Sequence, residues 1–459
     1  MKLFGSEKKF ELKTNMDLTQ GSISGGILRF CVPIFISQLF QQLYNLGDAW
    51  VIGHYAEDEA FAAVSSAGSI MFFFFGFFAG VSVGGGVVIS RYYGAKNTER
   101  VTAAIHTNFL FGLLASVFCT IAGTLLVPGI LNIMATPADV MPYSLTYLRI
   151  LFLGISANIM YNMCTSIMRS VGDSVSPLIY LTFSAILNVA LDCLFVIVFS
   201  WGVSGAAFAT VVTQFVSVIL CIVKMRRAKD FTRLEFGKLK WHGDIMKEVI
   251  VQGIPNGIQN SVISIGNMTV QKNINAFQAA AMSGMGAYQK IEGLVFLPIN
   301  CISMALPTFI SQNLGAKKFD RAKKGAAIGI FAGMIMAEIV GVLIFFKAPA
   351  FLRLFEDNEA AIEFGTIHSS TVSLAFFLLA FSHCAAGVMR GCGKSVVPMA
   401  TMLAFWCGVR VAYVTIAVEI WPVFRTVSLA YPITWTLSSI VFFCFLMFSD
   451  WTHTYEKKR

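Results

Sequence analysis

Polar side chains recur at helical spacing in an otherwise apolar segment near the N-terminus. One helical face would carry residues that are three, four and seven positions apart: Gln41, Tyr44 or Asn45, and Asp48. A polar stripe that ends in one carboxylate suits the wall of an internal cavity, where the carboxylate can bind a cation. The alternative is that Asp48 lies near the end of its helix and only caps it or reaches toward water.

A second polar face follows from Ser184, Asn188 and Asp192, which lie at successive spacings of four in another apolar segment. Thr210 lies in the apolar segment after that. We expect these groups to converge with the Asp48 side chain away from water, where a carboxyl group can take up and release a proton. The alternative is a structural cluster of polar groups that ties the helices together.

The second half of the chain carries a different set of ionisable residues within apolar segments: Lys272, Lys290, Glu292, His383 and Arg410. Lys290 and Glu292 are two residues apart and do not face each other on a helix, so we do not expect an ion pair between them. Arg410 is the candidate partner for Glu292. We interpret His383 as a hydrogen-bonded packing residue, with a pH switch as the alternative. All of these are candidate polar contacts in the second half.

The two halves repeat one another at an offset of about 221 residues. Residues 168–177 return as 389–398, and Gly94-Ala95-Lys96 returns as Gly315-Ala316-Lys317. The repeat has diverged in chemistry, because the position that matches Asp192 holds Tyr413. Several landmarks at one offset indicate duplication, which is the usual ground plan of secondary transporters.

The composition indicates a bilayer protein. The 459 residues are 56% hydrophobic and 13% charged, with a net charge of +9 and a mean hydropathy of +0.71, far outside the range of soluble domains. The basic residues fall in short clusters between apolar runs, so we expect no nucleic-acid partner. The chain has no nucleophile motif, phosphate loop, zinc motif or CxxC pair, and we therefore expect no enzymatic activity and no cofactor.

Twelve apolar segments are long enough to cross about 30 Å of hydrocarbon, which takes about 20 helical residues. They are 27–52, 61–90, 103–127, 143–168, 177–200, 203–223, 249–277, 284–311, 325–346, 365–389, 396–419 and 427–449. The polar stretch 224–247 divides these segments into two groups of six. We predict an all-α integral membrane protein with an N-terminal lobe (1–223), a linker (224–247) and a C-terminal lobe (248–459), related by an axis along the membrane normal.

The distribution of Lys and Arg predicts the orientation. An even number of spans places both termini on one side, and that side collects the basic linker together with most of the basic loops. Cytoplasmic loops carry an excess of Lys and Arg. We therefore expect a plasma-membrane protein with both termini and the linker in the cytoplasm.

These motifs together resemble the multidrug and toxic compound extrusion (MATE) family, in its bacterial drug-exporter branches. The resemblance rests on Pro33 followed by the stretch 38–48, on the two Gly-Ala-Lys loops, on the two loops at 169–177 and 390–398, and on Asn188 with Asp192. It implies two six-helix lobes around a central cleft, and export of organic cations by antiport against protons or sodium.

The resemblance also implies roles for particular residues. The positions that match the family's first-lobe cation site are Asp48, Asn188, Asp192 and Thr210. Tyr147 and Asn162 would support them, and Gln41 and Tyr44 line the same stripe. Sodium, if it is the coupling ion, would bind at Asp48 and Asp192. The acidic residues that other members carry on the seventh and tenth helices for a second-lobe sodium site are absent from the chain, which favours coupling in the first lobe.

The predicted function is cation-coupled efflux of cationic or amphipathic compounds by a monomer in the lipid bilayer. The nearest alternative is a flippase or exporter of a lipid-linked or anionic metabolite, which would need a strongly cationic cleft. Lys272, Lys290 and Arg410 could supply it. A channel would need a continuous polar pore, which the pattern does not indicate.

Overall fold

The computed structural model describes residues 16–55, 58–133, 136–137 and 140–456, except for the side chains at 45–46, 48–70 and 264–265. All regular elements in this part are helical. The first half contains α1 (Ile23–Tyr55), α2 (Asp58–Gly94), α3 (Thr98–Ile133), α4 (Met141–Leu153), α5 (Ile155–Ser170), α6 (Val175–Asp192), the π-helix η1 (Cys193–Val198) and α7 (Gly202–Arg227). The second half contains η2 (Phe236–Lys238), α8 (Gly243–Asn275), α9 (Gln278–Gly315), α10 (Phe319–Leu352), α11 (Glu359–Val372), η3 (Ser373–Ala375), α12 (Phe376–Gly391), α13 (Val396–Met402), the π-helix η4 (Leu403–Val409), α14 (Arg410–Ile420) and α15 (Phe424–Phe448).

In the described part, ten helical segments are long and apolar enough to cross a membrane, and the pair α4 and α5, bent by 41°, makes an eleventh. The 33-residue α8 does not meet that apolarity test. Three of its polar residues, Gln252, Asn256 and Gln259, are buried inside the protein. Because its polar face is turned away from lipid, α8 is the twelfth span, and the predicted all-α fold is confirmed.

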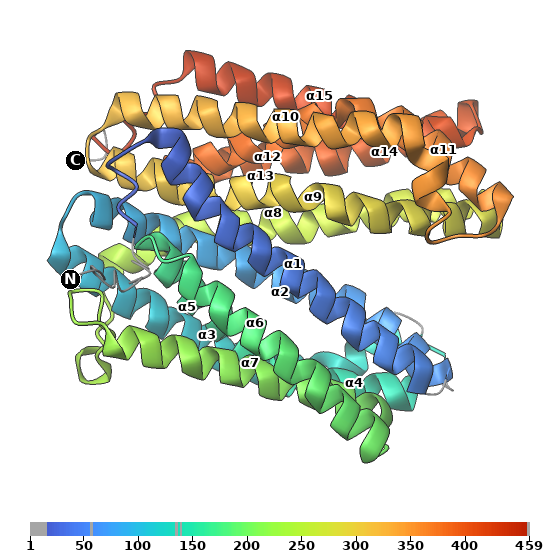
Figure 1. Ribbon diagram of the computed structural model, residues 1–459, viewed down its shortest axis with the longest axis horizontal. Coiled ribbons are helices and arrows are strands. Elements are labelled where there is room, and N and C mark those ends of the chain that lie inside the picture. The colour runs from blue at the N-terminus through green and yellow to red at the C-terminus, as the bar shows by residue number, and fades with distance from the viewer. Residues whose placement is uncertain (1–15, 56–57, 134–135, 138–139, 457–459) are drawn as a thin grey trace, which may run out of the picture.

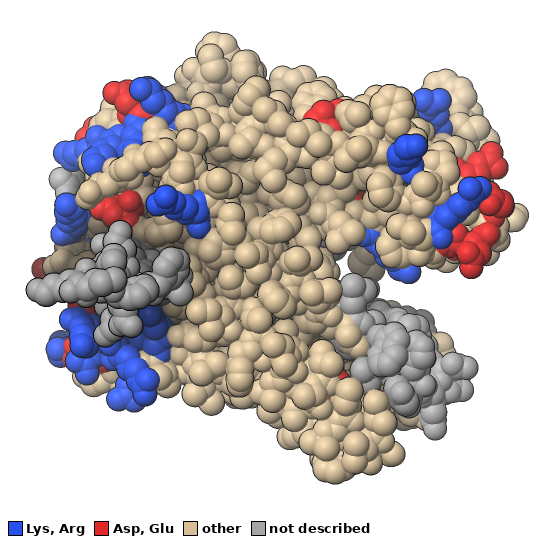
Figure 2. Space-filling view, in the orientation of Figure 1, with Lys and Arg blue, Asp and Glu red and all other residues tan. Residues whose placement is uncertain are grey.

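The helices form two groups, α1 to α7 and α8 to α15 (Figure 1). The described part of the chain begins and ends at the same end of the molecule, where the groups meet, and the groups diverge toward the other end. The space-filling view shows the surface hollowed between the groups at the diverging end (Figure 2). The two lobes therefore enclose a cleft that opens on the side opposite the termini.

The first helix of each lobe begins inside the hydrophobic core of the other lobe. Ile27, Phe30 and Ile34 of α1 are buried in the core built by α9 to α15. In the same way, Ile245 and Val249 of α8 are buried in the core built by α2, α3, α5 and α7. This exchange ties the lobes together at the end that carries the termini.

Glycines bring α2 and α8 into close contact along one seam between the lobes. A Cβ atom on Gly80 would lie 2.5 Å from the carbonyl oxygen of Asn256, and one on Gly84 would overlap the backbone of Gly253. One turn further along α8 in the same seam, the Asn260 side-chain amide donates to the Gly76 carbonyl at 3.0 Å. Small residues permit such close approach of two membrane helices, so this seam is closed over several helical turns.

Candidate functional site

The polar face predicted on α6 is present and buried. Ser184, Asn188 and Asp192 are 4%, 0% and 0% exposed, although their helix otherwise presents apolar residues such as Ile179 and Phe183 outward. The Ser184 hydroxyl lies 2.5 Å from the Ser217 hydroxyl on α7. A carboxyl group buried in a membrane helix costs about 2.5 to 3.5 kcal/mol on insertion scales, which makes Asp192 the strongest functional candidate in this lobe.

Asp192 occupies a special place in the backbone, because it is the last residue of α6 before the π-helical turn of η1. Single π-helical turns inside α-helices are rare and occur frequently at functional sites. This π-helical segment ends the span, which stops at Val198. No residue pattern in the sequence signalled this feature.

The turn of α1 that precedes Asp48 packs beside this face. A Cβ atom on Gly47 would lie 3.3 Å from a methyl group of Val189, which is next to Asn188 in sequence. Tyr44, one turn earlier, is 9% exposed, and Gln41 is partly buried. The backbone of α1 thus packs against α6 next to Asn188, while the Asp48 side chain lies outside the described residues and its approach to Asp192 stays a prediction.

The three remaining first-lobe candidates are partly buried and lie on other helices. Thr210 lies on α7, and its carbonyl accepts from the Thr213 hydroxyl at 2.9 Å. Asn162 donates to the carbonyl of Asn158, one turn earlier on α5, at 2.9 Å. Since α5 packs mainly against α2, α3 and α7 rather than α6, a direct role for Asn162 at Asp192 stays a prediction. Tyr147 is half-buried on α4, which also packs on α7.

In the second lobe, Arg410 is held in a packed cluster. Its guanidinium, 2% exposed, donates to the Thr434 hydroxyl at 2.9 Å and to the Asn267 side-chain oxygen at 3.3 Å. It also lies over the ring of Tyr431, 4.6 Å from the centroid, and over Trp406 at 5.2 Å. Aromatic faces stabilise a buried cation, so this cluster is built to hold the charge in place.

The other second-lobe candidates do not assemble around Arg410. Between the described side chains of Glu292 and Arg410 there is no ion pair within 4.0 Å, and the two interact only at longer range. The Lys290 ammonium lies 5.4 Å from the Phe355 ring centroid, and Lys290 and Glu292 form no ion pair, as predicted. His383 packs its ring edge-on against Phe296 and Trp406, with centroids 4.8 and 5.3 Å away.

The two repeated Gly-Ala-Lys motifs meet at the end of the molecule that carries the termini. A Cβ atom on Gly94 would overlap the carbonyl of Gln312, and one on Gly315 would overlap the carbonyl of Arg91. The lysines that follow, Lys96 and Lys317, both adopt positive φ, 54° and 58°. The C-terminal ends of α2 and α9 therefore cross in backbone contact. The sequence displayed both motifs without indicating that they touch.

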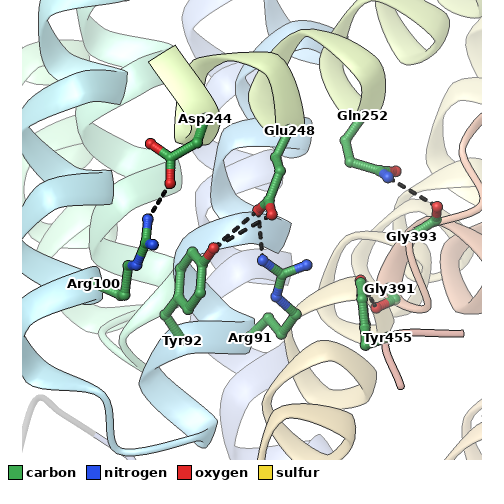
Figure 3. A network of polar contacts seen from close by, with 9 residues as sticks. All are labelled: Arg91, Tyr92, Arg100, Asp244, Glu248, Gln252, Gly391, Gly393 and Tyr455. Atoms are coloured by element: carbon green, nitrogen blue, oxygen red, sulfur yellow. Dashed lines mark hydrogen bonds and ion pairs between the residues drawn. The ribbon is translucent and has the colours of Figure 1, made fainter. Parts of the chain in front are cut away.

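Polar contacts between the lobes surround this crossing (Figure 3). Arg91 on α2 forms an ion pair with Glu248 on α8 at 2.5 Å, and its guanidinium lies 4.6 Å from the Tyr455 ring centroid. The Tyr455 hydroxyl donates to the Gly391 carbonyl at 3.1 Å. Because burial raises the pKa of Tyr455, the hydroxyl keeps its proton and remains a donor.

A second set of contacts reinforces this closure through Gln312 of α9. Its side-chain amide donates to the carbonyl of Ser170, at the end of α5 in the first lobe, at 2.9 Å. Its side-chain oxygen accepts from the backbone of Leu18 at 3.2 Å, in the segment before α1. The lobes are thus sealed at the end that carries the termini and open at the other end.

Comparison with known proteins agrees with this architecture. The profile of the MatE family matches residues 33–194 and 255–414, which are more than half of the chain. The chain is 27% identical over 392 residues to the probable multidrug resistance protein YoeA of Bacillus subtilis, covering 83% of this chain and 84% of YoeA. It is 24% identical over 436 residues to the probable multidrug resistance protein YpnP of the same organism, covering 95% and 97%.

Among solved structures, a multidrug resistance MATE family transporter in an outward-facing conformation superposes with a TM-score of 0.87 at 20% identity, covering 94% of this chain and 96% of that one. At this identity the likeness supports the fold. The family profile supports the assignment, and that family comprises transporters, not enzymes. The chain therefore belongs to the MATE family of multi-pass membrane transporters.

Proposed function

We propose that this protein exports organic cationic and amphipathic compounds by antiport against protons or sodium. The observation that carries the proposal is the fully buried Asp192 beside Asn188, at the point where α6 becomes π-helical. A carboxylate surrounded by neutral polar groups is stabilised by an added cation, either H⁺ or Na⁺. The names of the relatives, probable multidrug resistance proteins, support a drug-like cargo.

The coupling depends on a difference between two conformations. A ligand shifts a conformational equilibrium only by binding the two states with different affinity. The outer half of α1 packs against α6 near Val189, while its first turns are buried in the core of the second lobe. Cation binding between Asp48 and Asp192 would change how α1 packs on α6, and α1 would transmit that change to the second lobe.

Alternating access would require the sealed end to open. The lobes would have to separate at the crossing of Gly94 and Gly315 and break the Arg91–Glu248 ion pair and the Gln312–Ser170 hydrogen bond. Because the first helix of each lobe is buried in the core of the other, we expect the lobes to rock against each other, opening at this end while staying joined through these helices. With the cleft open opposite the termini, the described conformation corresponds to the cation-loading state.

We place the sealed end and both termini in the cytoplasm. Lys and Arg gather at that end of the molecule, and the middle of the surface is almost free of charge (Figure 2). This is the pattern of the positive-inside rule. The two six-helix lobes joined by the linker 224–247 complete a transport unit in one chain, so we propose a monomer.

The alternative cargo, a lipid-linked or anionic metabolite, has less support. It would need cations facing the cleft, yet Arg410 is buried among Thr434, Asn267, Trp406 and Tyr431. Lys290 stacks on Phe355 next to the acidic outer end of α10. Of the three cations named for this alternative, Arg410 is thus buried, and the exposed Lys272 and Lys290 remain.

Transport in proteoliposomes tests the proposal. Purified protein is reconstituted and ethidium movement is recorded under an imposed pH gradient or, separately, an imposed sodium gradient. We expect saturable ethidium transport driven by one of the two gradients and lost in Asp48→Asn. Transport that is independent of both gradients would reject the antiport, and competition by an anionic lipid precursor but not by ethidium would favour the alternative cargo.

A further inference from the structure

An apolar groove of about 580 Å³ runs along the outer surface of the first lobe. It lies between α2 and α3, and Trp241, two residues before α8, closes one end. Its walls are aromatic and aliphatic throughout: Phe73, Phe74, Phe77, Phe78, Phe111, Leu114, Ala115, Phe118, Cys119 and Trp241. Several of these side chains face outward, with Phe118 70% and Trp241 50% exposed. The groove therefore opens toward lipid, away from the central cleft.

The groove begins where the polar linker ends. The linker follows the first turns of α3 through hydrogen bonds of Thr102 to the Phe231 carbonyl at 2.7 Å and of the Glu235 backbone to His106 at 3.2 Å. The last of these contacts joins Thr107 and His242, 3.3 Å apart. These polar contacts lie at the water-facing level of α3. Phe111, one turn beyond Thr107, is the first groove residue on α3, so the groove starts at the boundary of the hydrocarbon.

From that boundary the groove runs into one leaflet. The seven helical steps from Phe111 to Phe118 span about 10 Å at 1.5 Å per residue, which is most of a leaflet about 15 Å thick. Trp241 at the mouth matches the preference of tryptophan for the membrane–water interface. The dimensions suit the upper part of one acyl chain that enters from the side of the linker.

The linker around the mouth is strongly basic. Residues 224–247 contain eight Lys and Arg against three Asp and Glu. Lys240, directly before Trp241, is exposed, as is Arg233. Arg226 lies over the Phe236 ring, 5.2 Å from its centroid. A cationic rim attracts a phosphate and repels a cationic drug, so the charge around the groove distinguishes a lipid from the proposed cargo.

We propose that this groove binds one acyl chain of an anionic phospholipid of the same leaflet, with the lipid phosphate held by the basic linker. The site is separate from the central cleft and does not depend on the proposed transport activity. A cationic substrate is the less suitable occupant, because the groove contains no acid and the linker at its mouth carries a net positive charge. Juxtamembrane cations contribute about a fivefold gain in affinity each for an anionic membrane surface.

The groove also adjoins the seam between the lobes. The ring of Phe77 packs against the position of Gly257 on α8, where a Cβ atom would lie 2.8 Å from the ring. Trp241 lies two residues before α8, the helix whose start is buried in the first-lobe core. A bound lipid would contact both the first lobe and the segment that leads into the second, and would stabilise the arrangement described here.

Fluorescence quenching by brominated lipids tests the site without any transport assay. The Trp241 signal is the difference between wild-type protein and Trp241→Phe in nanodiscs that contain phospholipids brominated on the acyl chain. We expect brominated phosphatidylglycerol to reach half-maximal quenching of this signal at a mole fraction about fivefold lower than brominated phosphatidylcholine.

Two variants separate the acyl and phosphate contributions. Ala115→Phe fills the groove and should remove most of the quenching by both lipids. Lys240→Gln should reduce the preference for phosphatidylglycerol, by up to about fivefold, whereas the matched control Lys323→Gln, an exposed lysine on α10, should not. Equal quenching by the two lipids in wild-type protein, or quenching unaffected by Ala115→Phe, would overturn the proposal. Displacement of the brominated lipid by ethidium, with no effect of Lys240→Gln, would overturn it in favour of a drug site.

Discussion

The fifth and eleventh spans occupy matching positions in the two lobes and carry buried charges of opposite sign. Both begin just before a repeated proline, Pro177 or Pro398, and both contain a π-helical segment. Asp192 directly precedes η1, whereas Arg410 directly follows η4. We propose that the same helix design serves two purposes in the two lobes, because a carboxyl group can change its charge at physiological pH and an arginine cannot.

The surroundings of Asp192 and Arg410 also differ. Arg410 is fixed by Thr434, Asn267 and two aromatic rings from other helices. Asp192 shares its helix face with the neutral Asn188 and Ser184. An environment that holds a permanent charge stabilises one structure, while neutral hydroxyl and amide groups on the same helix face can hydrogen-bond a carboxyl group in either ionisation state. The comparison therefore predicts loss of coupling from one site and loss of stability from the other.

The largest effect is expected for Asp192→Asn. The substitution keeps the shape of the side chain and removes its exchangeable charge, so gradient-driven ethidium efflux should fall about tenfold or more while the protein still folds. Proteoliposome transport and the melting temperature in detergent measure the two outcomes. Tyr413→Phe, at the matching position of the second lobe, serves as the control and should retain efflux. Unimpaired efflux in Asp192→Asn would contradict the assignment of coupling to the first lobe.

Arg410→Met should lower the stability of the protein and leave the coupling of transport to the gradient intact, the reverse of the result expected for Asp192→Asn. It removes hydrogen bonds to Thr434 and Asn267 and leaves the buried Thr434 hydroxyl without its guanidinium donor, which we expect to lower the free energy of unfolding by about 2 to 4 kcal/mol. The folded fraction should still transport ethidium in response to the gradient. A melting temperature equal to that of wild-type protein, together with lost coupling, would show that Arg410 belongs to the transport machinery and would remove the contrast between the lobes.

Much of this comparison was accessible from the sequence. Hydropathy and helix length predicted the twelve spans, including α8, and the repeat at an offset of about 221 residues predicted two related lobes. The spacing of four among Ser184, Asn188 and Asp192 predicted their common face, and all three are buried. These predictions succeeded because helical periodicity and membrane thickness act locally along the chain.

Features that depend on the packing of distant segments could not be predicted. The partners of Arg410 lie 24 and 143 residues away in sequence, and nothing local selects Thr434 over other hydroxyl groups of the same helix. The crossing of Gly94 and Gly315 and the exchange of the first helices between cores are likewise tertiary. The π-helical turns depend on how each helix packs, and their residues would also fit an α-helix.

A smaller effect on stability is expected for Thr434→Val, which tests how much this hydroxyl contributes to holding the Arg410 guanidinium. Its hydroxyl accepts from the guanidinium and donates to the carbonyl of Ala430 at 2.8 Å. Replacing it with a methyl group of similar shape should reduce the free energy of unfolding by about 1 to 2 kcal/mol. The exposed Thr436, whose hydroxyl donates to the Pro432 carbonyl, provides the matched control Thr436→Val, with an expected change below about 0.5 kcal/mol. Equal changes in the two variants would mean that Thr434 contributes little to holding the charge.

The smallest effect is expected for the hydroxyl pair at the start of the first-lobe face. Ser184 and Ser217 join α6 to α7 through a 2.5 Å contact, and hydrogen bonds between membrane helices average about 0.6 kcal/mol in double-mutant cycles. The cycle formed by Ser184→Ala, Ser217→Ala and the double variant should give a coupling energy of that size, with efflux retained in all three. Ser184 lies two helical turns from Asp192 on the same face. A loss of efflux in Ser184→Ala as large as that in Asp192→Asn would therefore mean that the coupling site extends along the whole polar face. Ser184 would then have a transport role and not only a structural one.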